Sequence, residues 1–230
     1  MIVFSLDGGI YGGFANVDNW ALPAPAYLGF SARTGGATNN HWVSRVTWGG
    51  AAQAAGLLSA LPSNRMDVPM AAPLATRMQA RQFTLSGSAV VSGDVLSITQ
   101  TELSQAGTAF AALTDPTNGA PLISTTEPFS VQFQMYCGDG TGADGLCVNV
   151  GGNDMGGRVG EDGVAKGVAV CFDEWANNGD HGVSIFYDGG MIWEEIGVCS
   201  NRQNCLPVSL FDDATWVRTT PRLWGTVPTR

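Results

Sequence analysis

Residues with the chemistry of ligands for a hard cation are concentrated in the segment DEWANNGD. Ca²⁺ is bound by about six to eight oxygens from carboxylates, amides, backbone carbonyls and water. Two carboxylates, one amide and one backbone carbonyl of this segment could fold back towards a single ion. The spacing therefore predicts a Ca²⁺ site whose ligands are Asp173, Trp175, Asn177 and Asp180. An ordinary acidic turn is the alternative, since Asn, Gly and Asp are the commonest turn residues.

Two short apolar runs would position this segment. Residues 146–150 and 168–172 have the composition of β-strands, and each lies next to loops rich in Gly, Asp and Asn. Short apolar strands with such loops at their ends indicate a rigid sheet that carries a polar site at one edge.

Other segments also have strand patterns. Apolar and polar residues alternate in FSVQFQMY, residues 129–136, which is typical of a strand with one buried face. The segments IVFSLDGGIYGG and VSIFYDGGMIWEE each have a DGG tip between β-forming residues, and they predict hairpins. The 230 residues suit one all-β domain, because sandwiches often reach about 200–250 residues as a single unit.

Four motifs together resemble a known family. They are YLGFSARTGG at 27–36, GADGL at 142–146, GGRVG at 156–160 and VCFDEWAN at 170–177. The chain is similar in these motifs to the legume-type (L-type) lectins of the concanavalin A-like family. The resemblance implies an all-β fold, a concanavalin-like jelly-roll β-sandwich of two antiparallel sheets. It also implies calcium-dependent binding of glycans or glycoproteins.

The resemblance assigns roles to individual residues. In the family, the Asp of the GADGL segment follows a cis peptide and accepts hydrogen bonds from sugar hydroxyls, which implies this role for Asp144 after Ala143. Gly157 would donate its backbone N–H to the sugar. Asn177 would contact both the sugar and the ion, and the implied Ca²⁺ ligands are the same four as above.

The loop from residue 33 to residue 40 would border the sugar and select it, with Arg33, Thr34 and Gly35 as binding residues. Trp42 and Trp175 are the tryptophans close enough in sequence to these loops to act as sugar platforms.

The chain also departs from the family pattern. Lectins with a second, transition-metal site have a Glu two residues before the first Asp, where this chain has Cys171. We therefore expect Ca²⁺ without that second metal. His181 directly follows Asp180, and we interpret it as a solvated loop histidine.

The order of the motifs is unusual, because the family's closing strands come first. We interpret residues 1–50 as C-terminal strands of a lectin-like domain and residues 83–230 as its N-terminal and central part. Residues 51–82, which are rich in Ala, Pro and Met, are interpreted as a linker, with a structural part of the core as the alternative. The chain is either a circular permutant or a piece of a tandem array. We expect the first segment to dock into the last one, unless it belongs to a preceding repeat.

Charge and hydropathy exclude some partners. The formal net charge is −9 at pH 7, from 11 Lys and Arg against 20 Asp and Glu. This composition argues against binding to nucleic acid, which needs basic side chains on its phosphates, and it disfavours anionic membranes. No apolar run approaches the roughly 20 residues that span a bilayer, so we expect no membrane insertion. Residues 1–15 lack the basic start of a signal peptide.

The five cysteines favour an oxidising compartment, and we expect an extracellular or cell-surface location. Cys199 and Cys205 bracket a short polar loop that a disulfide could close. Cys137 and Cys147 bracket the GADGL hairpin in the same way, which would leave Cys171 over. Buried free thiols are the alternative for all five.

The sequence does not favour catalysis, and we expect no enzyme activity. Retaining glycoside hydrolysis needs two carboxylates about 5 Å apart, commonly from alternate residues of one strand. The alternate neighbours of Asp173 are Cys171 and Trp175, whereas Glu194 and Glu195 are adjacent and would face opposite sides of a strand. The remaining alternative to a lectin is a structural or adhesive module of an extracellular repeat protein.

Overall fold

The structure is a computed structural model that describes residues 2–6, 9–11, 22–49, 76–115, 118–121, 129–153, 163–175, 182–196 and 217–223. The strands are β1 (Ile2–Leu6), β2 (Gly9–Tyr11), β3 (Tyr27–Arg33), β4 (Asn40–Gly49), β5 (Thr76–Arg77), β6 (Thr84–Gly87), β7 (Val90–Ser92), β8 (Val95–Thr99), β9 (Ala106–Ala112), β10 (Phe129–Gly138), β11 (Gly145–Gly151), β12 (Gly167–Asp173), β13 (Gly182–Tyr187), β14 (Gly190–Ile196) and β15 (Val217–Leu223), and one 3-10 turn, η1 (Ala80–Gln82), precedes β6.

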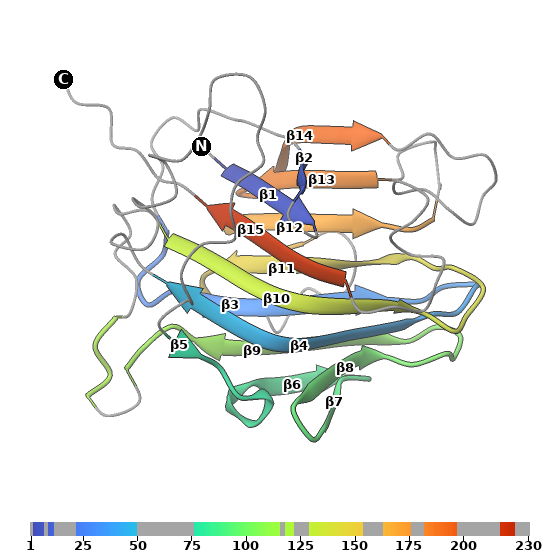
Figure 1. Ribbon diagram of the computed structural model, residues 1–230, viewed down its shortest axis with the longest axis horizontal. Helices are drawn as coiled ribbons and strands as arrows, with labels where there is room; N and C mark the ends of the chain where they lie inside the picture. Colours follow the sequence, from blue (N-terminus) through green and yellow to red (C-terminus); the bar gives the residue numbers. More distant parts are fainter. Residues whose placement is uncertain are drawn as a thin grey trace.

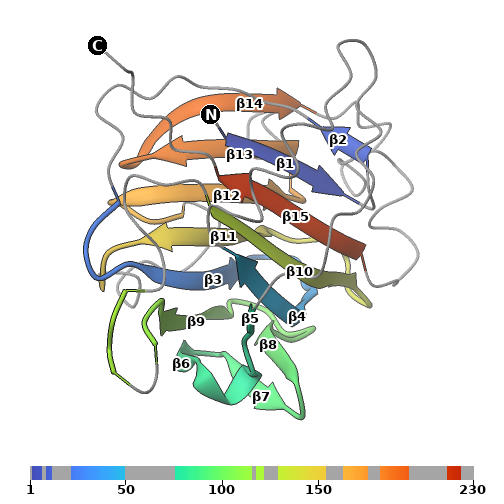
Figure 2. The same ribbon diagram turned by 60° about the vertical axis from the view of Figure 1, so that its left-hand side comes forward.

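These strands form two antiparallel sheets that lie face to face (Figure 1). The eight-stranded sheet has the order β2-β1-β15-β10-β4-β8-β7, with β5 also paired to β4. The seven-stranded sheet has the order β14-β13-β12-β11-β3-β9-β6. The strands of the two sheets cross at an angle, which the turned view makes plain (Figure 2). The predicted all-β sandwich of two antiparallel sheets is thus confirmed.

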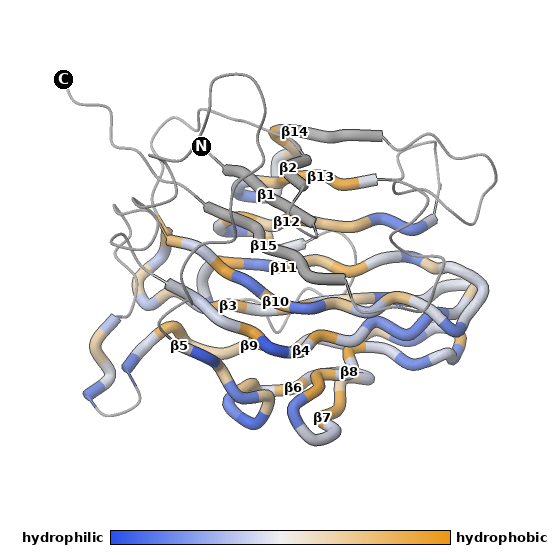
Figure 3. The backbone as a smooth tube through the Cα atoms, in the orientation of Figure 1, coloured by the Kyte–Doolittle hydropathy of each residue, from blue (hydrophilic) through white to orange (hydrophobic). Residues whose placement is uncertain are grey.

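The core lies between the sheets and follows the alternation of the sequence. Along β10, Phe129, Val131, Phe133 and Met135 are all at most 2% exposed, as the pattern of FSVQFQMY predicts. The ring of Phe133 meets Phe30 of the opposite sheet edge to face, with 5.0 Å between the ring centroids. Figure 3 shows the same alternation of apolar and polar residues along β4 and β10. One apolar face of each sheet therefore builds a common core.

Residues 27–49 supply a central strand to each sheet. β3 pairs with β9 on one side and with β11 on the other. β4 lies between β8 and β10 in the other sheet. These four strands come at least 45 residues later in the chain, since β8 begins at Val95 and β4 ends at Gly49, whereas the two-residue β5, also paired to β4, begins at Thr76.

Both predicted hairpins with DGG tips are present. β1 pairs with β2, and β13 pairs with β14, each time in antiparallel register. In the second hairpin, Asp188 and Gly189 have φ angles of 48° and 78°. Positive φ at both central residues is typical of the tight turns that match the twist of a hairpin.

No helix among the described residues is long and apolar enough to cross a membrane.

The disulfide predicted between Cys137 and Cys147 is wrong. Cys147 on β11 lies directly opposite Cys171 on β12, and these two form a disulfide. They pack with Ala169 in a small buried cluster separate from the main core. Cys137 is a buried free cysteine on β10, in the other sheet. The proposed Cys199–Cys205 disulfide lies outside the described residues.

Candidate functional site

The predicted site residues that the structure describes gather at one end of the sandwich. β3 and β12 end there and β4 and β11 begin there, on the right of Figure 1. The register explains this, because Gly145 pairs with Arg33 on one side and with Asp173 on the other. Residues 33, 144 and 173, far apart in sequence, are therefore neighbours.

Asp144 is held rigidly at the centre of this end. Its carboxylate Oδ2 accepts a hydrogen bond from Arg33 Nε at 3.1 Å. Its backbone N–H donates to the Arg33 carbonyl at 3.2 Å, and its own carbonyl accepts from the Glu174 N–H at 2.9 Å. The residue is 8% exposed. Backbone bonds to two strands thus fix the carboxylate before any ligand arrives.

Two glycines make this arrangement sterically possible. A Cβ at Gly145, which has φ +153°, would lie 2.3 Å from the carbonyl oxygen of Phe172. A Cβ at Gly35 would lie 3.1 Å from Asp144 Oδ2. A side chain at residue 35 would therefore require the Asp144 carboxylate to shift by a few tenths of an ångström.

The cis peptide expected before Asp144 is wrong. Among the described residues the cis peptide bond is Ala24–Pro25, and the Ala143–Asp144 bond is trans. The backbone hydrogen bonds of Asp144 to Arg33 and Glu174 hold the residue instead.

Thr34 lies beneath the surface and anchors the loop that follows β3. Its side chain is 1% exposed, it donates to the Glu102 carbonyl at 2.7 Å, and it accepts from the Gln105 N–H at 2.9 Å. The Gly35 carbonyl accepts a further bond from the Ser104 N–H at 3.1 Å. The loop is therefore fastened to residues 102–105, with Arg33 at its exposed edge.

Only part of the predicted Ca²⁺ site is described. Asp173 Oδ1 accepts a hydrogen bond from the Trp175 N–H at 2.8 Å, which closes a local turn directly after β12. Asn177 and Asp180 lie outside the described residues, and so does Gly157. The Ca²⁺ site therefore stays a prediction.

A buried polar cluster lies beside Asp144 and joins the two sheets. His41 comes from the start of β4, Cys137 from the end of β10, and Glu174 follows β12. Their exposed fractions are 0%, 3% and 6%. His41 Nε2 lies 3.2 Å from Glu174 Oε1, and one ligand atom from each of the three side chains lies within 4.8 Å of the others. Glu174 also accepts a hydrogen bond from Asn39 Nδ2.

Burial raises the pKa of the Cys137 thiol well above its usual value, and the neighbouring Glu174 carboxylate adds to this rise. With a chelator present, Cys137 in the folded protein should therefore react with iodoacetamide about tenfold more slowly, or slower still, than in the unfolded chain. Mass spectrometry of the Cys137 peptide measures both rates. Equal reaction rates in the folded and the unfolded protein would contradict the conclusion that the Cys137 thiol is buried and protonated.

One predicted sugar platform is already stacked. Trp42 faces Tyr136 with 4.7 Å between the ring centroids and 16° between the planes. The Tyr136 hydroxyl donates to Asp139 at 2.5 Å. Burial, together with this carboxylate, raises the pKa of Tyr136 to about 12. The pair rigidifies β4 and β10 next to the buried cluster.

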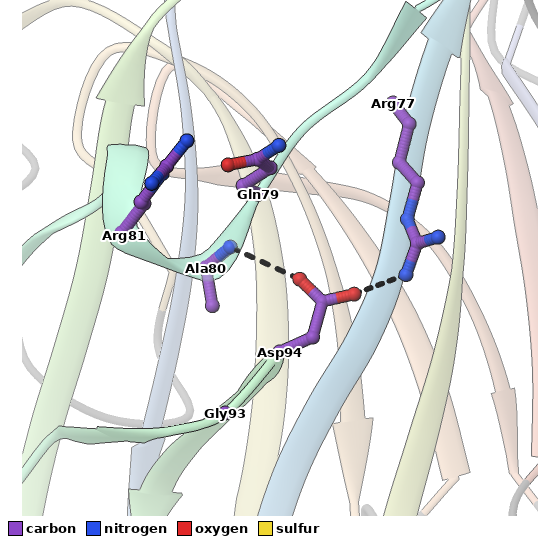
Figure 4. Close-up of a pocket in the computed structure, with 6 residues that line it drawn as sticks. All are labelled: Arg77, Gln79, Ala80, Arg81, Gly93 and Asp94. Carbon is purple, nitrogen blue, oxygen red and sulfur yellow. Dashed lines mark hydrogen bonds and ion pairs between the residues drawn. The ribbon is translucent and has the colours of Figure 1, made fainter.

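A polar hollow of about 450 Å³ shares no residue with this end of the sandwich. Figure 4 shows that Asp94 lies between Arg77 and the backbone of Ala80. Asp94 accepts from Ala80 N at 3.4 Å and forms an ion pair with Arg77. Because its carboxylate is engaged within the protein, the hollow is the weaker candidate for a binding site.

Sequence reasoning missed the cluster of His41, Cys137 and Glu174. The sequence is compatible with a Cys137–Cys147 disulfide as well as with a free thiol, and the Ca²⁺ pattern includes Asp173 but not its neighbour Glu174. The positions of Cys137 and Glu174 in the sequence were a usable signal, since each residue lies at the end of an apolar strand and beside a loop rich in oxygen-bearing side chains.

No protein-family model matches this chain, and no curated protein or solved structure shows significant similarity to it.

Proposed function

We propose that this protein is a calcium-dependent carbohydrate-binding module, with Asp144 as the acceptor for sugar hydroxyls. The observation that carries this proposal is the pairing of Gly145 with both Arg33 and Asp173, because it brings the Asp144 carboxylate close to Asp173 at the end of β12. A sugar offers pairs of hydroxyl groups, and a preorganised carboxylate acceptor binds them with little ordering cost.

The hydrogen-bonding capacity of the site supports this role. An ionised carboxylate has about four acceptor positions, and Arg33 Nε occupies one of those on Asp144. The Arg33 side chain is 41% exposed, so it lies at the rim of the site. Thr34 would act by holding the loop rather than by contacting the sugar. Gly35 would leave space for the ligand.

Calcium would act on the sugar site indirectly. Asp173 and the Trp175 carbonyl would be two of its ligands, with Asn177 and Asp180 completing the protein part of the set. The ion would then order the loop that carries Asn177, which would also contact the sugar. Less conformational entropy of the loop would therefore be lost when the sugar binds.

Binding fits the described carboxylates better than hydrolysis does. Asp144 is paired with Arg33, and Glu174 is enclosed by Asn39 and His41. A glycosidase instead needs two carboxyl groups that flank the scissile bond, one as an acid and the other as a base or nucleophile. We propose an extracellular location because the Cys147–Cys171 disulfide requires oxidising conditions to form.

A glycan array with the full chain, read in Ca²⁺ and again in EGTA, tests this function. We expect binding in Ca²⁺ that is lost in EGTA. The Asp144→Asn variant, which keeps the shape but removes the charge, should bind at least about tenfold more weakly, since hydrogen bonds to a charged group contribute roughly 1.5–3 kcal/mol. Asp94→Asn is the matched control, since Asp94 is also paired with an arginine, and it should bind as the parent does.

A second candidate function is a structural or adhesive module, and the Arg33–Asp144 ion pair favours it, since that pair alone could explain why Asp144 is fixed. A blank array from folded, calcium-loaded protein would support this alternative. Unchanged binding by Asp144→Asn would also contradict our assignment of the site. A thermal melt of each variant shows that the fold is retained.

A further inference from the structure

The cluster of His41, Cys137 and Glu174 has the features of a metal site distinct from the predicted Ca²⁺ site. A nitrogen, a sulfur and an oxygen atom converge from three separate segments. His41 Nε2 and Glu174 Oε1 are both buried, and neither makes a hydrogen bond of normal geometry with the described residues. The Cys137 thiol also interacts with the Glu174 carboxylate. Two buried polar atoms that lie 3.2 Å apart without a hydrogen bond of normal geometry need an explanation, since leaving buried polar atoms unpaired is unfavourable.

The other neighbour of His41 supports one tautomer of the ring. The Thr99 hydroxyl donates to the Asn39 carbonyl at 3.1 Å, and its oxygen lies 2.6 Å from His41 Nδ1. With its proton engaged by Asn39, this oxygen accepts from an Nδ1–H group. In that tautomer of the neutral imidazole, Nε2 carries a lone pair.

His41 Nε2 lies 3.2 Å from Glu174 Oε1. Two lone pairs at this distance repel each other unless a proton or a metal ion lies between them. In a tetrahedral site with Zn–N and Zn–O distances of about 2.0 Å, the ligand atoms are about 3.3 Å apart. The observed separation therefore suits one small cation bound by both atoms.

The surrounding hydrogen bonds resemble those of established metal sites. A histidine ligand usually donates its second ring N–H to an oxygen, and a carboxylate ligand is itself hydrogen-bonded. Here Thr99 receives the Nδ1–H of His41, and Asn39 donates to Glu174 Oε2. Thr99 contacts Nδ1 of His41 and Asn39 contacts Oε2 of Glu174, so both hydrogen bonds use an atom that the proposed ion would not.

We propose that His41 Nε2, Cys137 Sγ and Glu174 Oε1 bind one Zn²⁺ ion. A mixed sulfur, nitrogen and oxygen donor set favours Zn²⁺ over Ca²⁺ or Mg²⁺, which take oxygen ligands. Three protein ligands leave a fourth position for water. The thiol proton leaves when the ion binds, because a metal-bound cysteine is a thiolate. This site is separate from the position of Cys171, which forms a disulfide.

The ion would join the two sheets at the end that carries Asp144. His41 and Cys137 belong to the eight-stranded sheet, and Glu174 extends from β12 of the seven-stranded sheet. The Glu174 N–H donates to the Asp144 carbonyl. Zinc therefore would stabilise the frame behind Asp144 without contacting a ligand there.

Titration of the chelator-treated full chain with Zn²⁺ and Co²⁺ tests this proposal. We expect one Zn²⁺ per chain, a raised melting temperature, and a Co²⁺ form with a thiolate-to-cobalt charge-transfer band and tetrahedral d–d bands. Ca²⁺ in excess should not displace the Co²⁺. A folded chain that binds no Zn²⁺, or that gives a Co²⁺ spectrum without the thiolate band, would overturn the proposal.

Variants assign the ligands. Glu174→Gln keeps an acceptor for Asn39 but removes the charge, and it should bind Zn²⁺ at least about tenfold more weakly, as should Cys137→Ser. Glu102→Gln is the matched control, because Glu102 is exposed, and its affinity should not change. Equal affinity in Cys137→Ser and the parent would exclude this site. The spectrum of the parent decides the matter if a variant fails to fold.

Discussion

Replacing Phe133 with alanine should lower the free energy of unfolding by about 3–5 kcal/mol, the usual range when a fully buried phenylalanine is truncated. The side chain is 0% exposed and contacts Phe30 across the two sheets. Its removal would leave a cavity between central strands that are fixed on both sides by hydrogen bonds, so little collapse is possible. Urea denaturation followed by tryptophan fluorescence measures the change.

Phe110→Ala is the matched control for this experiment. Phe110 is half-buried on β9 and meets Tyr27 edge to face at 6.3 Å. Its truncation should lower the free energy of unfolding by about 1–2 kcal/mol, because the half-buried Phe110 side chain has less apolar area shielded from water than Phe133 has. Equal losses in the two variants would contradict the placement of Phe133 in the core.

Replacing both Cys147 and Cys171 with alanine should lower the free energy of unfolding by about 3 kcal/mol. The disulfide links residues 24 apart in sequence, and without it the unfolded chain gains conformational entropy. Alanine is small enough to keep the packing against Ala169. A reductant should destabilise the variant less than it destabilises the parent, because Cys199 and Cys205 are present in both and only the parent loses the Cys147–Cys171 disulfide.

Because the two sulfur atoms are buried, the comparison of oxidised and reduced parent protein needs a reduction step in denaturant. Cys147 and Cys171 are 0% and 3% exposed, and a Cβ on Gly163 would lie 3.4 Å from Cys171 Sγ. The backbone at residue 163 thus covers the bond, and reduction should be fast only in denaturant. The parent must therefore be reduced while unfolded. Identical unfolding curves for the oxidised and reduced parent would contradict a stabilising disulfide.

Local patterns in the sequence predict several of the strands. Alternation along residues 129–136 predicted which residues of β10 face the core, and the apolar runs at 146–150 and 168–172 became β11 and β12. Side chains of a strand alternate between its two faces, so burial on one face is visible in a short stretch of sequence. The fold class follows from such stretches.

Contacts between distant segments were not predictable in the same way. The pairing of Cys147 with Cys171 depends on the register between β11 and β12, and a shift of one residue would separate them. Proximity in sequence instead suggested Cys137, which belongs to the other sheet. The cluster of His41, Cys137 and Glu174 depends on three strands meeting at one end, which no local pattern records.

The central positions of β3 and β4 determine when the sandwich can form during translation. Residues 27–33 have no strand to pair with until residues 106–112 and 145–151 have left the ribosome. Until then, apolar side chains such as those of Leu28 and Phe30 are exposed to water and to other nascent chains. Long-range pairing of this kind slows folding and favours aggregation of the partly made polypeptide. Slower synthesis would prolong that exposure, and a holding chaperone would be most useful during it.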